Sequence, residues 1–162
     1  MKISLNPNAK DAATRDGLVA EGGFGKYYTD HMVMCEWSEK DGWGEPHLMP
    51  YGPISLDPAT AVFHYGQEIF EGMKAYRQPD GSIALFRPTA NAKRFANSAK
   101  RLALPEMPVE LFMETIEALV TQDAGWVPSK VGESLYIRPF MIATEVGLGV
   151  RPTNKATYIL IA

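Results

Sequence analysis

The chain has 162 residues, of which 46% are hydrophobic, and its formal net charge is −3. That length fits one domain with enough apolar residues for a real core, and the mild negative charge argues against nucleic acid as the main partner, because nucleic-acid binding favours a basic face. The single cysteine, Cys35, excludes an internal disulfide and gives no metal cluster.

The N-terminal region is polar and rich in turn residues. Residues 1–10 contain no apolar stretch of the kind that a signal peptide needs, and no apolar run of the chain reaches the length of a membrane span, so we expect a cytoplasmic protein. We interpret residues 1–23 as an N-terminal arm and residues 24–162 as one domain. Within that domain, residues 31–37 and 47–51 are predicted strands.

The stretch 62–86 organises the rest of the chain. Asp80-Gly81 is a strong hairpin signal, because glycine takes positive φ without steric cost, so residues 74–76 and 83–86 should pair as antiparallel strands. The first half of the stretch mixes polar side chains with large apolar ones. That mixture is compatible with the wall of a functional site, and equally with a buried turn whose polar groups satisfy one another.

Two amphipathic helices follow the hairpin. The first begins at Pro88, carries apolar residues at three- and four-residue spacing and ends before Pro105. The second begins at Pro108 and ends near Gly125. Strands and helices therefore come in separate blocks, which predicts an α+β fold: a two-layer sandwich in which two helices cover a largely antiparallel sheet.

Residues 134–144 form the longest predicted strand. Its alternation places Arg138 between Tyr136 and Phe140 on one face of the sheet. A desolvated arginine needs an anion or several acceptors. Its partner is either a ligand anion or one of three carboxylates of the chain, those of Glu68, Glu71 and Glu145.

The sequence closes on residues 157–162, a strongly apolar, strand-prone run with no turn or polar tail after it. A buried strand seldom ends a protein so abruptly, so we expect the sequence to be cut at a domain boundary or within a longer protein. The alternative is a domain whose last strand ends at the terminus.

Several of these segments carry a resemblance to a known family. They are FGKYYTDHMVMCEW, HYGQEIFEGMKAYR, FRPTANAKRF, SLYIRPFMIATEVGLGV and the closing TYILIA. In this order they resemble the N-terminal domain of the branched-chain aminotransferases, pyridoxal 5'-phosphate enzymes of class IV and fold type IV. The most specific parts are Tyr65 with Phe70-Glu71-Gly72, and Tyr-x-Arg-Pro at 136–139.

The resemblance implies roles for individual residues. Arg94, in Asn-x-x-Arg, would hold the cofactor phosphate, which a guanidinium grips in a bidentate manner. Arg138 would bind the distal carboxylate of glutamate. Residues lining the pocket for the substrate side chain would be Phe24, Phe70 and Tyr136. Residues reaching into the active site of the partner subunit of a homodimer would be Tyr65, Leu148 and Val150.

Without the resemblance, simpler interpretations remain for some of these residues. Arg94 would be a solvated charge on a helix surface. Leu148 and Val150 would pack a loop.

The implied activity is transfer of an amino group between leucine, isoleucine or valine and 2-oxoglutarate. The family's Schiff-base lysine lies in a C-terminal domain that this chain does not reach, so we assign no catalytic residue and no metal site, and we expect the chain alone to be inactive. One alternative is a sister class IV enzyme, a D-amino-acid aminotransferase or an aminodeoxychorismate lyase, against which Tyr136 and Arg138 argue together. Another is a non-catalytic module that binds phosphate or carboxylate.

Overall fold

One mixed β-sheet runs through the computed structural model, which describes residues 1–162. Its main path follows the order β1 (Lys2–Ile3), β4 (His47–Pro50), β2 (His31–Ser38), β9 (Lys155–Ile161), β8 (Leu135–Ala143), β6 (Met73–Arg77) and β7 (Ile83–Leu85). Two short strands lie off this path: β3 (Gly42–Trp43) pairs with β2, and β5 (Glu68–Phe70) pairs with β8. Every pair is antiparallel except that of β1 with β4.

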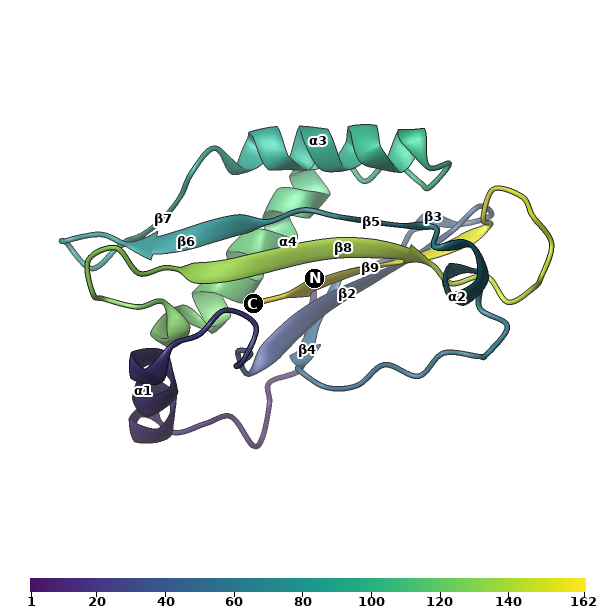
Figure 1. Ribbon diagram of the computed structural model, residues 1–162. Coiled ribbons are helices and arrows are strands. Elements are labelled where there is room, and N and C mark those ends of the chain that lie inside the picture. Colours follow the sequence, from purple (N-terminus) through teal and green to yellow (C-terminus); the bar gives the residue numbers. More distant parts are fainter.

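The two long helices lie on one side of this sheet. α3 (Pro88–Arg101) and α4 (Val109–Gln122) are the long ones, and α1 (Ala12–Glu21), α2 (Ala61–Tyr65) and the 3₁₀ turn η1 (Ala124–Trp126) are shorter. α4 contacts β2, β4 and β9, and α3 contacts α4 and β5. In Figure 1 α4 lies behind the sheet, whereas the front of β8 carries no helix. The predicted α+β sandwich is confirmed.

Most of the predicted elements are present with slightly different ends. The hairpin is formed by β6 and β7, in which Ala75 lies opposite Leu85. The stretch before the hairpin contains a helix that the pattern did not predict, α2, which ends at Gly66 in the left-handed region (φ 57°). Five residues are too few for a helical period to show in the sequence. None of the helices combines the length and the apolar character needed to cross a membrane.

The first residues of the chain are tied to the sheet by β1 and by a buried histidine. The backbone N–H of Asn6 donates to Nε2 of His31 at 2.9 Å. Nδ1 of the same ring therefore carries the proton and donates to the Asp123 carboxylate at 2.6 Å. Two polar side chains that are nearly inaccessible to solvent are thus satisfied, and Asn6 is held against β2.

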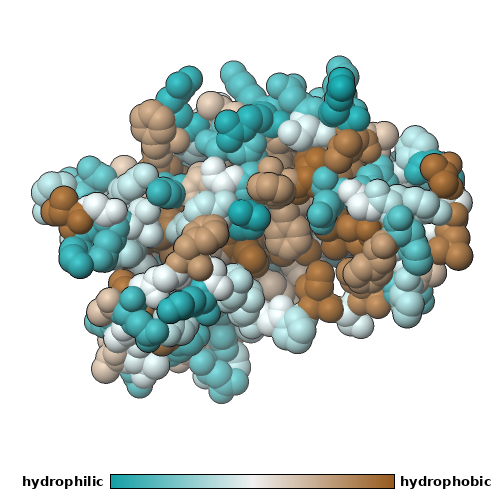
Figure 2. Space-filling model, in the orientation of Figure 1, coloured by the Kyte–Doolittle hydropathy of each residue, from teal (hydrophilic) through white to brown (hydrophobic).

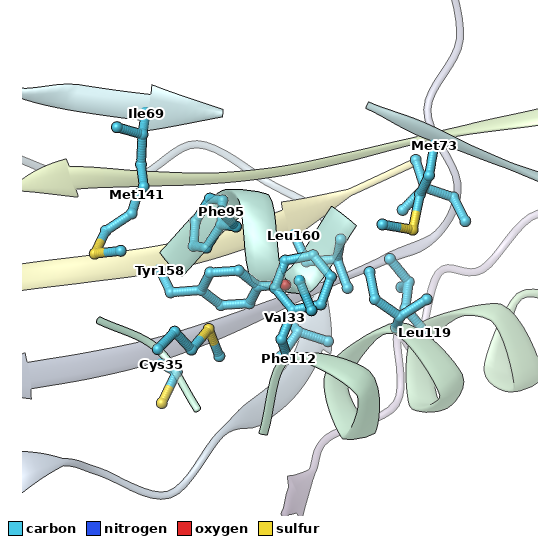
Figure 3. Packing of buried hydrophobic residues seen from close by; sticks show 14 of the residues in the cluster. Val33, Cys35, Ile69, Met73, Phe95, Phe112, Leu119, Met141, Tyr158 and Leu160 are labelled. Atoms are coloured by element: carbon cyan, nitrogen blue, oxygen red, sulfur yellow. The ribbon is translucent and has the colours of Figure 1, made fainter. Parts of the chain in front are cut away.

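The core lies between the sheet and the two long helices, and an aromatic cluster occupies its middle. The rings of Phe95, Phe112 and Tyr158 have centroids between 5.4 and 6.0 Å apart (Figure 3). The Thr115 hydroxyl donates to the Phe112 carbonyl at 2.7 Å, so it accepts from the Tyr158 hydroxyl at 3.0 Å. Burial raises the pKa of Tyr158, which keeps this phenol protonated and able to donate.

Replacing Phe95 by alanine should lower the free energy of unfolding by about 3–5 kcal/mol, because the ring is fully buried and its removal leaves a cavity that α3 and α4 cannot close. Phe86, which is 75% exposed, is the matched control, and Phe86→Ala should change this free energy by no more than about 0.5 kcal/mol. Urea unfolding followed by circular dichroism measures both. Equal losses would show that the core does not depend on Phe95.

Candidate active site

The open face of β8 carries an arginine held by aromatic side chains. Arg138 donates from Nη2 and Nε to the Tyr136 hydroxyl, at 2.7 and 3.2 Å. Its guanidinium lies over the Phe70 ring, with 4.4 Å between Cζ and the ring centroid. These contacts fix the plane of the guanidinium, while Nη1 makes no hydrogen bond. A stacked guanidinium with a free N–H edge is suited to bind a carboxylate.

The aromatic wall extends beyond β8 to the loop after α1. Phe24 packs edge-on against Tyr136, with ring centroids 4.8 Å apart, although the side chain is 78% exposed. Together with Arg138 they line a cavity of about 660 Å³, which also includes Lys74. In the view of Figure 2, hydrophobic side chains gather over the middle of this face. The predicted pocket residues Phe24, Phe70, Tyr136 and Arg138 therefore come together.

The alternative of an ion pair for Arg138 does not hold. Glu71 pairs with Arg94, and Glu145 pairs with Arg151. Glu68 forms no ion pair and is exposed. Arg138 consequently has no ion-pair partner in the chain. Its guanidinium contacts the Tyr136 hydroxyl and the ring faces of Phe70 and Tyr136.

A buried carboxylate sits next to this wall. The Glu71 side chain is 4% exposed, and Arg94 binds both of its oxygens, from Nε and Nη2, each at 2.6 Å. Asn91, one helical turn earlier on α3, donates to the same carboxylate at 2.9 Å. Burial pushes the pKa of Glu71 up, but the bonds from Arg94 and Asn91 outweigh it and hold the pKa below its ordinary range.

Arg94 has a second, outward side. Its side chain is 67% exposed, and Nη1 makes no hydrogen bond. The carboxylate of Glu71 also raises the pKa of Arg94 and keeps it charged. Arg94 lines a shallow groove of about 410 Å³, together with Ser98 and Arg101 of α3 and with Phe70 and the exposed Glu68 of β5. Guanidinium and hydroxyl donors are the groups that bind phosphate, so the residues present fit a phosphate group.

The remaining predicted residues form a separate group at the far end of β8. Tyr65, at the end of α2, donates its hydroxyl to the backbone carbonyl of Leu148. Leu148 and Val150, in the loop between β8 and β9, are 64% and 85% exposed. Arg138 and Ala143 lie five positions apart along the strand, a span of roughly 17 Å. Within one chain this group does not meet the pocket around Arg138.

Sequence reasoning missed the part played by Glu71 and Asn91. The sequence predicts Glu71 as a possible partner for Arg138 and as part of a family motif, and Asn91 enters only through the motif Asn-x-x-Arg that contains Arg94. The signal was available in the three-residue spacing of Asn91 and Arg94, which points two donors at one acceptor. What it did not give was the acceptor, since Glu71 lies twenty residues earlier.

Known proteins give this geometry a context. No protein-family model matches the chain. Over 99% of its length it is 57% identical to a probable branched-chain-amino-acid aminotransferase of Streptomyces coelicolor. It is 56% identical, again over 99% of its length, to a branched-chain-amino-acid aminotransferase of Mycolicibacterium smegmatis. The chain is similar to the N-terminal part of the branched-chain-amino-acid aminotransferases. It spans 45% and 44% of the length of these two relatives.

Solved aminotransferase structures have the same fold. The T.th. branched-chain amino acid aminotransferase bound to N-(5'-phosphopyridoxyl)-L-glutamate superposes with a TM-score of 0.60 at 28% identity, over 78% of this chain and 39% of that one. The same enzyme with 4-methylvaleric acid gives a TM-score of 0.59 at 28% identity, with the same coverage. The fold is thus that of the small domain of branched-chain aminotransferases, fold type IV.

Replacing Glu71 by glutamine should destabilise the protein by about 1–2 kcal/mol at neutral pH, at the low end for charged hydrogen bonds because Arg94 faces solvent. The folded-state pKa of Glu71 is lowered, so the ionised carboxylate contributes stability that is fully present above its ordinary pKa of 4.5 and is lost as the pH falls through the folded-state value. Urea unfolding from about pH 7 to about pH 3 should therefore show the wild-type advantage shrinking in acid.

Glu68→Gln is the control for this measurement, because Glu68 is exposed and forms no ion pair. A wild-type advantage over Glu71→Gln that stays constant down to the lowest pH would contradict the assignment of the buried charge.

Proposed function

We propose that this chain supplies the substrate-side wall and one phosphate ligand of a branched-chain-amino-acid aminotransferase, which moves an amino group between leucine, isoleucine or valine and 2-oxoglutarate. The single observation that carries the proposal is Arg138, stacked on Phe70 and bonded to Tyr136, with no carboxylate of the chain against it. An apolar wall that carries an uncommitted guanidinium suits a pocket that accepts both apolar and carboxylate side chains.

Arg94 is proposed to hold the phosphate of pyridoxal 5'-phosphate. The Glu71 carboxylate occupies one edge of the guanidinium and leaves Nη1 without a hydrogen bond, and the Arg94 side chain lines the groove. The cofactor, when bound, supplies the electron-withdrawing group on which amino transfer depends. Arg94 contributes charge and hydrogen bonds that retain and orient the phosphate, and Glu71 holds Arg94 in place. We assign no catalytic lysine to this chain.

Arg138 is proposed to recognise the distal carboxylate of glutamate and 2-oxoglutarate. When leucine is bound instead, the guanidinium keeps its acceptor in the Tyr136 hydroxyl and its stack on Phe70, so it is not left bare against an apolar side chain. Phe24 and Phe70 then provide apolar surface. The phosphopyridoxyl-glutamate and the 4-methylvaleric acid bound by the T.th. enzyme support such a dual pocket.

Tyr65, Leu148 and Val150 are proposed to serve the pocket of a second subunit. They lie at the opposite end of β8 from Arg138 and expose apolar surface, so a homodimer would give them a role that one chain does not. Elution of the whole protein as a monomer would argue against this role. We further propose a cytoplasmic enzyme of branched-chain amino acid biosynthesis, with residues 1–23 as an N-terminal arm of the domain 24–162.

In the whole protein, Arg94→Ala should raise the dissociation constant of pyridoxal 5'-phosphate about tenfold or more, because a charge-assisted contact to phosphate is lost. Equilibrium titration of the cofactor-free protein measures this. Lys93→Ala is the matched control, since Lys93 is an exposed cation of the same helix that does not line the groove, and it should change the dissociation constant far less. Equal cofactor affinity of Arg94→Ala and the wild type would refute the phosphate role.

In the whole protein, Arg138→Met should lower kcat/KM for glutamate and 2-oxoglutarate much more than for leucine and its 2-oxo acid. Only the first pair carries a distal carboxylate, and a buried charge without a partner costs several kcal/mol, which is on the order of a hundredfold or more in kcat/KM. Half-reactions assayed separately for each substrate give the two ratios. A fall by one common factor would make Arg138 a structural residue of the wall.

A further inference from the structure

Gly72 lies directly beneath the Tyr136 side chain. It precedes β6, where Lys74 is the register partner of Tyr136. A Cβ atom added at Gly72 would overlap the Tyr136 hydroxyl oxygen and would lie 3.0 Å from Cζ and 3.3 Å from Cε2 of that ring. The Tyr136 hydroxyl thus occupies the space that any side chain at position 72 would fill.

The backbone around Gly72 is held on several sides. The N–H of Glu71 donates to the Pro139 carbonyl at 2.8 Å. The Gly72 carbonyl accepts from Asn91 at 3.3 Å, and the next residue, Met73, is paired with Ile137. The backbone cannot retreat without breaking these bonds. A side chain at position 72 would therefore displace the Tyr136 ring, because this ring can move more easily than the hydrogen-bonded backbone.

Space, and not backbone freedom, is what requires glycine here. Unlike eight other glycines of the chain, Gly72 does not adopt positive φ. An alanine would therefore fit the backbone without strain, and the three atoms nearest to its Cβ would all belong to the Tyr136 side chain. This makes the position suitable for a clean substitution.

Displacing the Tyr136 hydroxyl has a consequence for Arg138. The hydroxyl oxygen is the only hydrogen-bond acceptor of the guanidinium, from Nη2 at 2.7 Å and from Nε at 3.2 Å. If it moves, Arg138 keeps the Phe70 stack but loses the bonds that fix its rotation about that ring. The free edge of the guanidinium would then no longer point in one direction.

We propose that Gly72 is a positioning residue that sets the direction of Arg138 through the Tyr136 hydroxyl, and so determines how well the pocket distinguishes a substrate with a distal carboxylate from an apolar one. The proposal rests on the proposed function of Arg138. It predicts that Gly72 acts through one oxygen atom, which a double-mutant cycle can isolate.

The test uses the whole protein and the variants Gly72→Ala, Tyr136→Phe and their combination. Gly72→Ala should lower the midpoint of thermal unfolding, and should lower kcat/KM for glutamate about tenfold relative to leucine, as expected for lost bonds to a charged group. On the Tyr136→Phe background the oxygen is gone, and only the milder approaches to Cζ and Cε2 of the ring remain. On this background, adding Gly72→Ala should change the glutamate-to-leucine ratio of kcat/KM by less than about threefold. It should also lower the midpoint of thermal unfolding much less than it does in the wild-type background.

Gly52→Ala is the matched control, because a Cβ at Gly52 meets no atom within 4 Å and Gly52 has no positive φ. It should leave the unfolding midpoint and the substrate ratio unchanged. Equal effects of Gly72→Ala on both backgrounds, in the midpoint and in the ratio, would overturn the proposal. Coupling in the midpoint with no change in the glutamate-to-leucine ratio would also overturn it, and would place the fault in the role proposed for Arg138, since the contact with Tyr136 would then be established.

Discussion

The buried carboxylate of Glu71 is the constraint on which the site depends. A carboxylate that is 4% exposed is costly unless each oxygen has a partner, and here Arg94 and Asn91 provide them. Both partners stand on α3, whereas Glu71 directly follows β5. The ion pair therefore fixes α3 against the edge of the sheet and, at the same time, turns the free side of Arg94 outward into the groove.

The residues on either side of Glu71 serve the other arginine. Phe70 presents its ring to Arg138, and Gly72 leaves room for the hydroxyl that Arg138 binds. Three consecutive residues thus connect the proposed phosphate ligand with the proposed carboxylate ligand. A shift of this short segment would move both arginines together, which couples the geometry of the two ends of the proposed site through a rigid piece of backbone.

The strand β8 arranges the remaining parts. Its core face buries Ile137 and Met141 against the helices, and its open face carries Tyr136 and Arg138. The loop that follows it, with Leu148, lies at the other end of the strand, beside α2 (Figure 1). An extended strand of nine residues keeps its two ends far apart, so the division of the predicted residues into two groups is a consequence of sheet geometry.

The sequence by itself determined the elements with a strong local signal. The Asp80-Gly81 turn predicted the β6–β7 hairpin, apolar spacing predicted α3 and α4, and the alternation along β8 placed Tyr136 and Arg138 on one face, because turn chemistry and periodicity act over a few neighbouring residues. The tertiary structure alone decided which carboxylate pairs with which arginine and that Gly72 meets the Tyr136 hydroxyl. It also decided that Gln67 donates to the carbonyls of Leu102 and Ala103, directly after α3. Those contacts join residues far apart in the chain, and their partners are set by the packing of α3 and β8 on the sheet, which no local pattern encodes.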